Sequence, residues 1–297
     1  MLYLVDASVY IFRAYFSLPD TFRDADGNPA QAVYGFAGFL TELLERENPR
    51  HIACAFDESL TTSFRNDTWP DYKANRELPP EELERQLGAC RDVAEALGIA
   101  CFASDRYEAD DIIGTLASMH RSTEFPITIV TRDKDLGQLV EPGDTWWDYA
   151  GNKRLDVAGI VEKMGVKPSQ VPDLLGLMGD SVDNIPGVKG VGAKTAAALL
   201  AHFDSLDDLY ARLDDVADVP VRGAASLARK LEADRDMAFL SRELATIHCS
   251  VPLDAAALDD LAWRYPDIDI VTPLYERLNF GKRLHRQAEK FAARRNA

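Results

Sequence analysis

The amino-acid sequence predicts an α/β fold with a mostly parallel central sheet, followed by a second half built of helices. Over residues 1–140, short and nearly continuous apolar runs alternate with helical periodicity, a pattern typical of parallel strands buried on both faces. After residue 155 the strand patterns fade while helical periods continue. We therefore expect an α/β core over residues 1–165 and a helical region over residues 166–297.

Each expected element follows from its own pattern. Apolar runs of four or five residues indicate strands, and longer amphipathic periods indicate the helices that separate them. We expect strands at 2–5, 52–56, 99–102 and 127–131, helices between them at 8–18, 31–47, 81–97 and 108–120, and further helices at 155–164, 171–178, 192–202, 221–233, 236–246 and 271–280.

Composition bounds the class of protein. Of the 297 residues, 46% are hydrophobic and 28% are charged, as in an ordinary globular protein. No run of 18 apolar residues occurs, and the first residues meet an acid at Asp6, so we expect neither a membrane-spanning helix nor a secretory signal. Four cysteines without a CxxC pair predict reduced thiols in a cytoplasmic protein.

The net charge of −16, taken alone, argues against a nucleic-acid partner, whose binding proteins usually carry a basic surface. The charge is unevenly distributed, however. Residues 282–297 carry six basic side chains against one acid, whereas residues 204–218 carry six aspartates against one arginine. Local clusters must therefore decide which partners the chain binds.

Acidic residues follow the predicted strands. Asp6 follows the first, Asp57 the second, and Asp133 and Asp135 follow the fourth. Each acid by itself is explained equally well as a helix cap or a turn residue. Because parallel strands share one carboxyl edge, however, these side chains should converge there. Three more acids open the helix at 108–120: Glu108, Asp110 and Asp111.

Seven acids at one sheet edge would repel one another strongly without a counter-charge, and divalent metal is the simplest source of one. The set contains no histidine or cysteine, and an all-oxygen set suits Mg²⁺ or Mn²⁺ better than Zn²⁺. Carboxylate sites of this kind serve phosphoryl chemistry, often with two ions about 4 Å apart.

The glycine-rich segment 179–195 matches neither common nucleotide loop. Ala193 stands where a Walker A motif needs lysine, and Thr195 replaces the last glycine of a dinucleotide motif. A helix–hairpin–helix and a simple connector remain. In the first case a turn through Gly187, Gly190 and Gly192 would lead into a helix whose backbone N–H groups hold a DNA phosphate, flanked by Lys189 and Lys194.

Together these segments resemble the bacterial and phage 5′-nuclease family, which includes flap endonucleases and the 5′→3′ exonuclease domain of DNA polymerase I. The resemblance runs from Leu4 to Gly281, and its most specific pieces are Tyr-Glu-Ala-Asp-Asp at 107–111, Asp-Lys-Asp-Leu at 133–136 and the glycine-rich segment from Gly179. It implies a resolvase-like (PIN-like) core, a helical arch over about 58–80, and a helix–hairpin–helix over about 171–203.

The resemblance also implies two sets of metal ligands that hold two or more Mg²⁺ or Mn²⁺ ions, with K⁺ at the helix–hairpin–helix. This chain keeps all nine acids of the family pattern, which favours an active nuclease. The first set would be Asp6, Asp57, Glu108, Asp110 and Asp133, and the second Asp135, Asp180 and Asp183, with Asp111 bridging or nearby.

In the arch, the resemblance implies that Lys73 and Arg76 contact the scissile phosphate and that Tyr72 stacks on a base. The alternative is that these charges form a solvated face, as charges in a loop more often do. Arg65 and Arg13 would also contact DNA. Phe12 replaces a tyrosine that the family often has beside Arg13. Trp146 and Trp147 belong to no motif, and we expect them to be packing residues.

The implied activity is hydrolysis of DNA at 5′ ends, 5′ flaps and branched duplex, leaving 5′-phosphate and 3′-hydroxyl products. A metal-bound hydroxide would attack the phosphodiester in line, without a covalent intermediate. We expect a monomer without a membrane partner. Two alternatives stay open, a non-catalytic binder of branched DNA and an RNase H-like ribonuclease.

Overall fold

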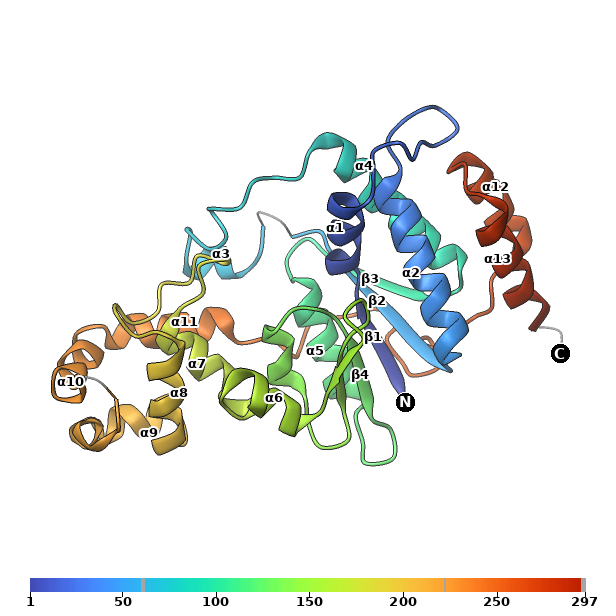
Figure 1. The fold of residues 1–297 in the computed structure, drawn as a ribbon. Helices are drawn as coiled ribbons and strands as arrows, with labels where there is room; N and C mark the ends of the chain where they lie inside the picture. The colour runs from blue at the N-terminus through green and yellow to red at the C-terminus, as the bar shows by residue number, and fades with distance from the viewer. Residues whose placement is uncertain (60–61, 222, 295–297) are drawn as a thin grey trace. The chain divides into compact units, whose positions relative to one another are not determined.

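The structure, a computed structural model, describes residues 1–59, 62–221 and 223–294. It divides into two compact units, and Figure 1 shows their elements. The first unit comprises Met1–Leu60, Leu78–Arg132 and Cys249–Ala297, and the second comprises Thr61–Glu77 and Asp133–His248. The units are thus compact without being continuous in sequence, and the predicted boundary at residue 165 stays a prediction.

The first unit contains a parallel sheet whose strands lie in the order β3–β2–β1–β4. All four predicted strands are confirmed, and β1 is buried along its whole length. The chain moves outward from β1 to β3 and then returns to the other side of β1, so the strand order reverses between β1 and β4. In open α/β sheets a ligand binds at such a reversal. The strands are β1 (Leu2–Asp6), β2 (His51–Asp57), β3 (Ala100–Ser104) and β4 (Ile127–Val130).

Helices cover this sheet, and those predicted in its sequence are confirmed, with ends that move by no more than three residues. The segment after His248 also belongs to this unit, where the indole N–H of Trp263 donates to the Leu97 carbonyl at 2.9 Å. The helices are α1 (Ala7–Ser17), α2 (Gln31–Glu47), α4 (Glu81–Ala96), α5 (Ala109–His120), α12 (Ile268–Arg277) and α13 (Lys282–Arg294).

Within the basic stretch, Lys282–Arg294 form a helix that the sequence did not lead us to expect. In α13, Leu284, Ala288 and Phe291 lie on one face and are buried, and Figure 1 shows the helix beside α2. Its cations meet acids of α2: Lys290 Nζ lies 2.5 Å from Glu45 Oε1. The local positive charge is therefore partly neutralised within the unit. Arg295 lies outside the described residues.

The second unit is mostly helical, as predicted, with one antiparallel hairpin of β5 and β6 that the sequence did not reveal. Trp146 and Trp147 form that hairpin's core and are 2% and 0% exposed, which confirms them as packing residues. Arg222, inside a predicted helix, lies outside the described residues. The elements are α3 (Arg65–Thr68), β5 (Thr145–Asp148), β6 (Lys153–Leu155), α6 (Val157–Met164), α7 (Val171–Met178), α8 (Ala193–His202), α9 (Leu206–Ala211), α10 (Ala224–Ala233) and α11 (Arg235–Ala245).

Two further predictions can be compared with the described part of the chain. Its helices include none that combines the length and apolarity needed to span a bilayer. The four cysteines, all of them described, form no disulfide.

Candidate metal and nucleic-acid site

Two predicted ligands of the first unit stand at the carboxyl ends of neighbouring strands. Asp6 ends β1 and is 6% exposed, and its Oδ2 accepts a hydrogen bond of 2.8 Å from the Thr131 hydroxyl, just beyond β4. Asp57 ends β2 and accepts from the backbone N–H of Ala109 at 2.7 Å. Both carboxylates are therefore positioned by neutral donors at the sheet edge where the strand order reverses.

Asp57 also opens onto solvent. A cavity of about 260 Å³ lies beside it and is lined by Ser8, Glu58 and Arg91, among other residues. The Ser8 hydroxyl accepts a hydrogen bond of 3.2 Å from the Asp57 backbone N–H, which fixes the end of the strand. A ligand can thus reach this carboxylate without unfolding the sheet.

The start of α5 brings three acids together through its cap. Glu108 is the N-cap residue, and its side chain and that of Asp111 form a reciprocal capping box. The Asp111 backbone N–H donates to Asp110 Oδ1 at 2.7 Å. The positive end of the helix dipole stabilises these carboxylates. Asp111 is 0% exposed, so the structure gives it a capping role, and the bridging role stays a prediction.

The second unit holds the other four acids in a different environment. Asp133 Oδ1 accepts from the Asp135 backbone N–H at 2.9 Å. Among the described residues, no group donates to the buried Oδ1 of Asp135. Burial, then the charge of Asp133, raises the pKa of Asp135 to about 8, and burial raises the pKa of Asp133. A buried oxygen without a donor in an all-carboxylate group fits a hard divalent cation.

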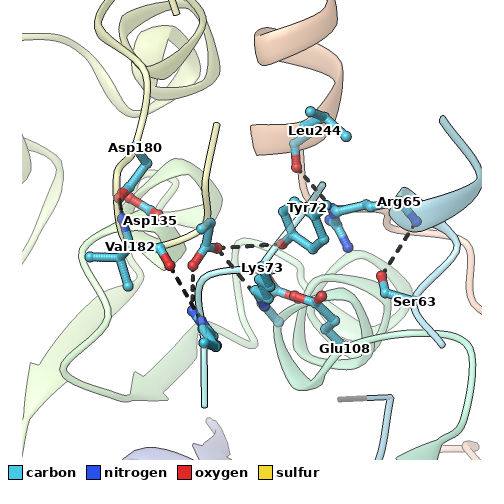
Figure 2. A network of polar contacts seen from close by, with 12 residues as sticks. Ser63, Arg65, Tyr72, Lys73, Glu108, Asp135, Asp180, Val182 and Leu244 are labelled. Carbon is cyan, nitrogen blue, oxygen red and sulfur yellow. Dashed lines mark hydrogen bonds and ion pairs between the residues drawn. The ribbon is translucent and has the colours of Figure 1, made fainter. Parts of the chain in front are cut away.

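Cations of the protein itself pair with the remaining two acids. Lys134 Nζ lies 3.0 Å from Asp180 Oδ2, while Asp180 Oδ1 accepts from the Val182 N–H at 2.8 Å (Figure 2). Asp183 forms an ion pair with Arg76. Within the described ranges, no three histidine, cysteine, aspartate or glutamate side chains converge closely enough to hold a metal ion. The predicted ligand sets therefore stay predictions.

The segment predicted as a helical arch contains only one short helix within residues 62–80, the four-residue α3. Arg65, predicted to contact DNA, is 2% exposed and donates from Nε to the Leu244 carbonyl at 2.8 Å (Figure 2). Its second carbonyl partner is Thr246, at 3.0 Å. In this conformation Arg65 ties the segment to the end of α11, a role that only a long-range contact could reveal.

Tyr72 also differs from its predicted role. Its ring is 4% exposed and belongs to the apolar core of the second unit, so in this conformation it presents no face on which a base could stack. Its hydroxyl donates to Asp183 Oδ2 at 3.4 Å. Stacking on a base would require the segment to leave this core. Arg13, in contrast, is exposed on α1, as a phosphate contact requires.

The glycine-rich segment does connect two helices, and the first of them, predicted at 171–178, is confirmed. It ends at Met178, with Gly179 as its C-cap. Gly187 has a φ of +63°, and a Cβ there would lie 2.2 Å from the Gly179 nitrogen, so this glycine is required by packing. Gly192 caps α8, and a Cβ there would meet no described atom within 4 Å.

Lysines and one further glycine surround this turn. Gly190 has a φ of +81°, which favours glycine. Lys189 donates its backbone N–H to Asp234 Oδ2 at 3.0 Å, and Lys194 lies in the first turn of α8. The segment thus consists of two helices joined by a glycine-rich turn, as the predicted helix–hairpin–helix requires. Its contact with DNA stays a prediction.

Profiles of known families match almost the whole chain. The N-terminal resolvase-like domain of 5′-3′ exonuclease matches residues 1–165, and its C-terminal SAM fold matches residues 166–269. DNA polymerase I of Pseudomonas aeruginosa is 42% identical over 280 residues, which cover 94% of this chain and 30% of that protein. The chain spans between 25% and 32% of the length of such curated relatives.

Solved structures share the fold. The T5 5′-exonuclease with bound zinc has a TM-score of 0.65 at 19% identity, covering 98% of this chain and 99% of that one. The catalytic core of Rad2 in complex with DNA has a TM-score of 0.61 at 17% identity, covering 98% and 91%. The predicted fold class, a resolvase-like α/β core with a helical C-terminal region, is confirmed.

Proposed function

This chain belongs to the 5′-3′ exonuclease family, and from that premise we propose that it is a divalent-metal-dependent nuclease that cuts DNA at 5′ ends and 5′ flaps. One observation carries the proposal: Asp6 and Asp57 stand at the carboxyl ends of β1 and β2, where the strand order reverses, and neutral donors orient them. Such a group at such an edge is suited to metal ions and a phosphate.

We assign the nine acids to the metals as the family pattern suggests. Asp6, Asp57, Glu108, Asp110 and Asp133 would hold one ion, and Asp135, Asp180 and Asp183, with Asp111 nearby, would hold a second. Carboxylate-bound Mg²⁺ or Mn²⁺ supplies charge stabilisation for the transferring phosphoryl group and the leaving 3′ oxygen. The side chains of this protein would orient the ions.

Other residues would bind and position the nucleic acid. Lys73 and Arg76 would contact the scissile phosphate, and Arg13 a neighbouring one. The turn of Lys189, Gly190 and Gly192 would grip duplex DNA through backbone N–H groups at the start of α8, with Lys194 beside it. K⁺ at this turn and a monomeric state belong to the same proposal.

A labelled 5′-flap duplex tests the function directly. We expect cleavage near the junction in Mg²⁺ and none in EDTA, with products that carry a 5′-phosphate and a 3′-hydroxyl. An RNA flap of the same length should be cut more slowly, which separates this activity from that of a ribonuclease. Tight flap binding without cleavage in either Mg²⁺ or Mn²⁺ would show a binding protein instead.

A further inference from the structure

In the second unit, two segments far apart in sequence are held together by polar contacts. We call residues 71–76 the strap and residues 181–184 the acid loop. The Asn75 side-chain amide donates to the Ser181 carbonyl at 2.8 Å. The other contacts of this kind are Asn184 Nδ2 to the Asp71 carbonyl at 2.6 Å and the Lys73 N–H to the Asp183 carbonyl at 3.0 Å.

The same two segments also join through charge. Three groups of the strap converge on Asp183: Arg76 pairs with it, Lys73 Nζ lies 3.9 Å from its Oδ2, and the Tyr72 hydroxyl donates to it (Figure 2). Lys134 pairs with Asp180 in a similar way. The strap is thus held by Asp183, one of the acids that we assign to the second metal ion.

We propose that metal binding at these acids displaces the protein's own cations, and that losing them releases the strap from the acid loop. This inference rests on the proposed function, and it names how the site is regulated. A carboxylate that binds a divalent ion cannot keep full ion pairs with a guanidinium and an ammonium, because the ion repels both. Lys73 and Arg76 then become available for the phosphate that the metal ions also contact.

Backbone conformation favours the release. Lys73 has a φ of +55°, in the left-handed region that a lysine rarely adopts. The contacts with the acid loop hold it there, since its N–H bonds to Asp183. Strain at Lys73 is therefore relieved when the strap leaves the acid loop. Metal binding then favours release of the strap, and release of the strap favours metal binding.

Because metal ion and protein cations compete for the same acids, removing a protein cation should strengthen metal binding, and this gives the first test. Lys134→Gln removes a competing cation from Asp180, so we expect Ca²⁺, a non-catalytic probe, to bind about fivefold more tightly in calorimetry, the size of one partly exposed ion pair. Arg212→Gln is the matched control because Arg212 pairs with Asp208 and Asp215 elsewhere in the same unit. Its Ca²⁺ affinity should equal that of the wild type.

Trp69 reports on the strap itself. Its indole packs against the apolar core of the second unit, and the Tyr72 N–H donates to its carbonyl at 2.9 Å. In protein labelled with 5-fluorotryptophan, the Trp69 resonance is identified by its loss in Trp69→Phe. Adding Ca²⁺ should shift or broaden this resonance, while that of Trp263, in the first unit, stays unchanged.

Two results would overturn the proposal. One is an unmoved Trp69 resonance when calorimetry shows the Ca²⁺ site saturated, and the other is weaker Ca²⁺ binding by Lys134→Gln, which would make Lys134 a structural support of the site. Flap cleavage in Mg²⁺ keeps this test separate from the function: an active nuclease with an unmoved Trp69 contradicts only the strap release, whereas an inactive one that also binds no Ca²⁺ contradicts the proposed function.

Discussion

The structure gives different partners to acids of the first unit and to acids of the second. Asp6 and Asp57 accept hydrogen bonds from a hydroxyl and a backbone N–H, which fix the carboxylates. Asp180 and Asp183 instead pair with a lysine and an arginine, which cancel their charge. Neutral donors make a site ready for a cation, whereas charged partners must first be displaced from it.

The largest expected effect comes from removing a predicted metal ligand of the first unit. Asp110→Asn should lower the cleavage rate by about a thousandfold, near 4 kcal/mol, because a ligand charge is lost. The amide oxygen can still accept from the Asp111 N–H, so the cap of α5 and flap binding should survive. Single-turnover cleavage and fluorescence anisotropy measure the two properties. A variant that cuts at the wild-type rate would remove Asp110 from the site.

The pH dependence of stability tests the acids of the second unit. The pKa of Asp135, about 8 in the folded protein against 3.8 ordinarily, means that the folded state holds a proton that the unfolded chain releases. In EDTA the contribution of Asp135 to the free energy of unfolding should therefore be greatest below about pH 4 and fall by about 2–4 kcal/mol as the pH rises to about 8.

Urea unfolding across this range measures the slope, and Asp135→Asn is the control because it removes the titrating group. Ca²⁺ should flatten the profile of the wild-type protein, since a bound ion replaces the proton. If Asp135→Asn keeps the full slope, another group causes it, and burial does not raise the pKa of Asp135 in the folded protein.

Weakening a neutral donor should have a smaller effect. Thr131→Val removes the hydroxyl that orients Asp6 but keeps the shape of the side chain. We expect cleavage to slow by about 10- to 100-fold, as when other supporting groups of metal ligands are lost. Thr131→Ser should restore most of the rate. Equal rates for the valine and serine variants would show that the hydroxyl does not position Asp6.

At the glycine-rich turn, one substitution should move stability and binding in opposite directions. Gly192→Asp supplies a better N-cap to α8, so the free energy of unfolding should stay level or rise slightly. The added charge should weaken duplex binding about tenfold, near 1.4 kcal/mol. Gly192→Asn has nearly the same shape without the charge, and it should bind close to the wild type. Equal affinities for all three proteins would make the segment a connector.

The smallest effect is expected on α13. Lys290→Gln removes an exposed ion pair with Glu45, which should change the free energy of unfolding by less than about 1 kcal/mol. The salt dependence of flap binding should not change, because this cation already has an acidic partner within its own unit. A lower salt slope would instead place Lys290 in contact with DNA.

Most of the fold could be predicted from local pattern, and the failures have physical causes. The bounds of α2 follow from apolar spacing, whereas α13 was missed because its residues were interpreted only as a basic cluster, although Leu284, Ala288 and Phe291 have helical spacing. Asp57 could be placed because alternating strands and helices predict parallel strands, which share one carboxyl edge. The roles of Arg65 and Tyr72 could not, because their partners lie far away in the sequence, at Leu244 and Asp183.

The division into units has a consequence for how the chain folds during synthesis. The first unit needs residues after His248, whereas the second is complete once His248 has been made. As the ribosome adds about 5–20 residues per second, the inserted unit can form its core while the sheet still lacks the segment that carries Trp263. A fragment of the chain that ends near residue 250 should therefore already protect α7 and α11 from protease, while α2 remains accessible.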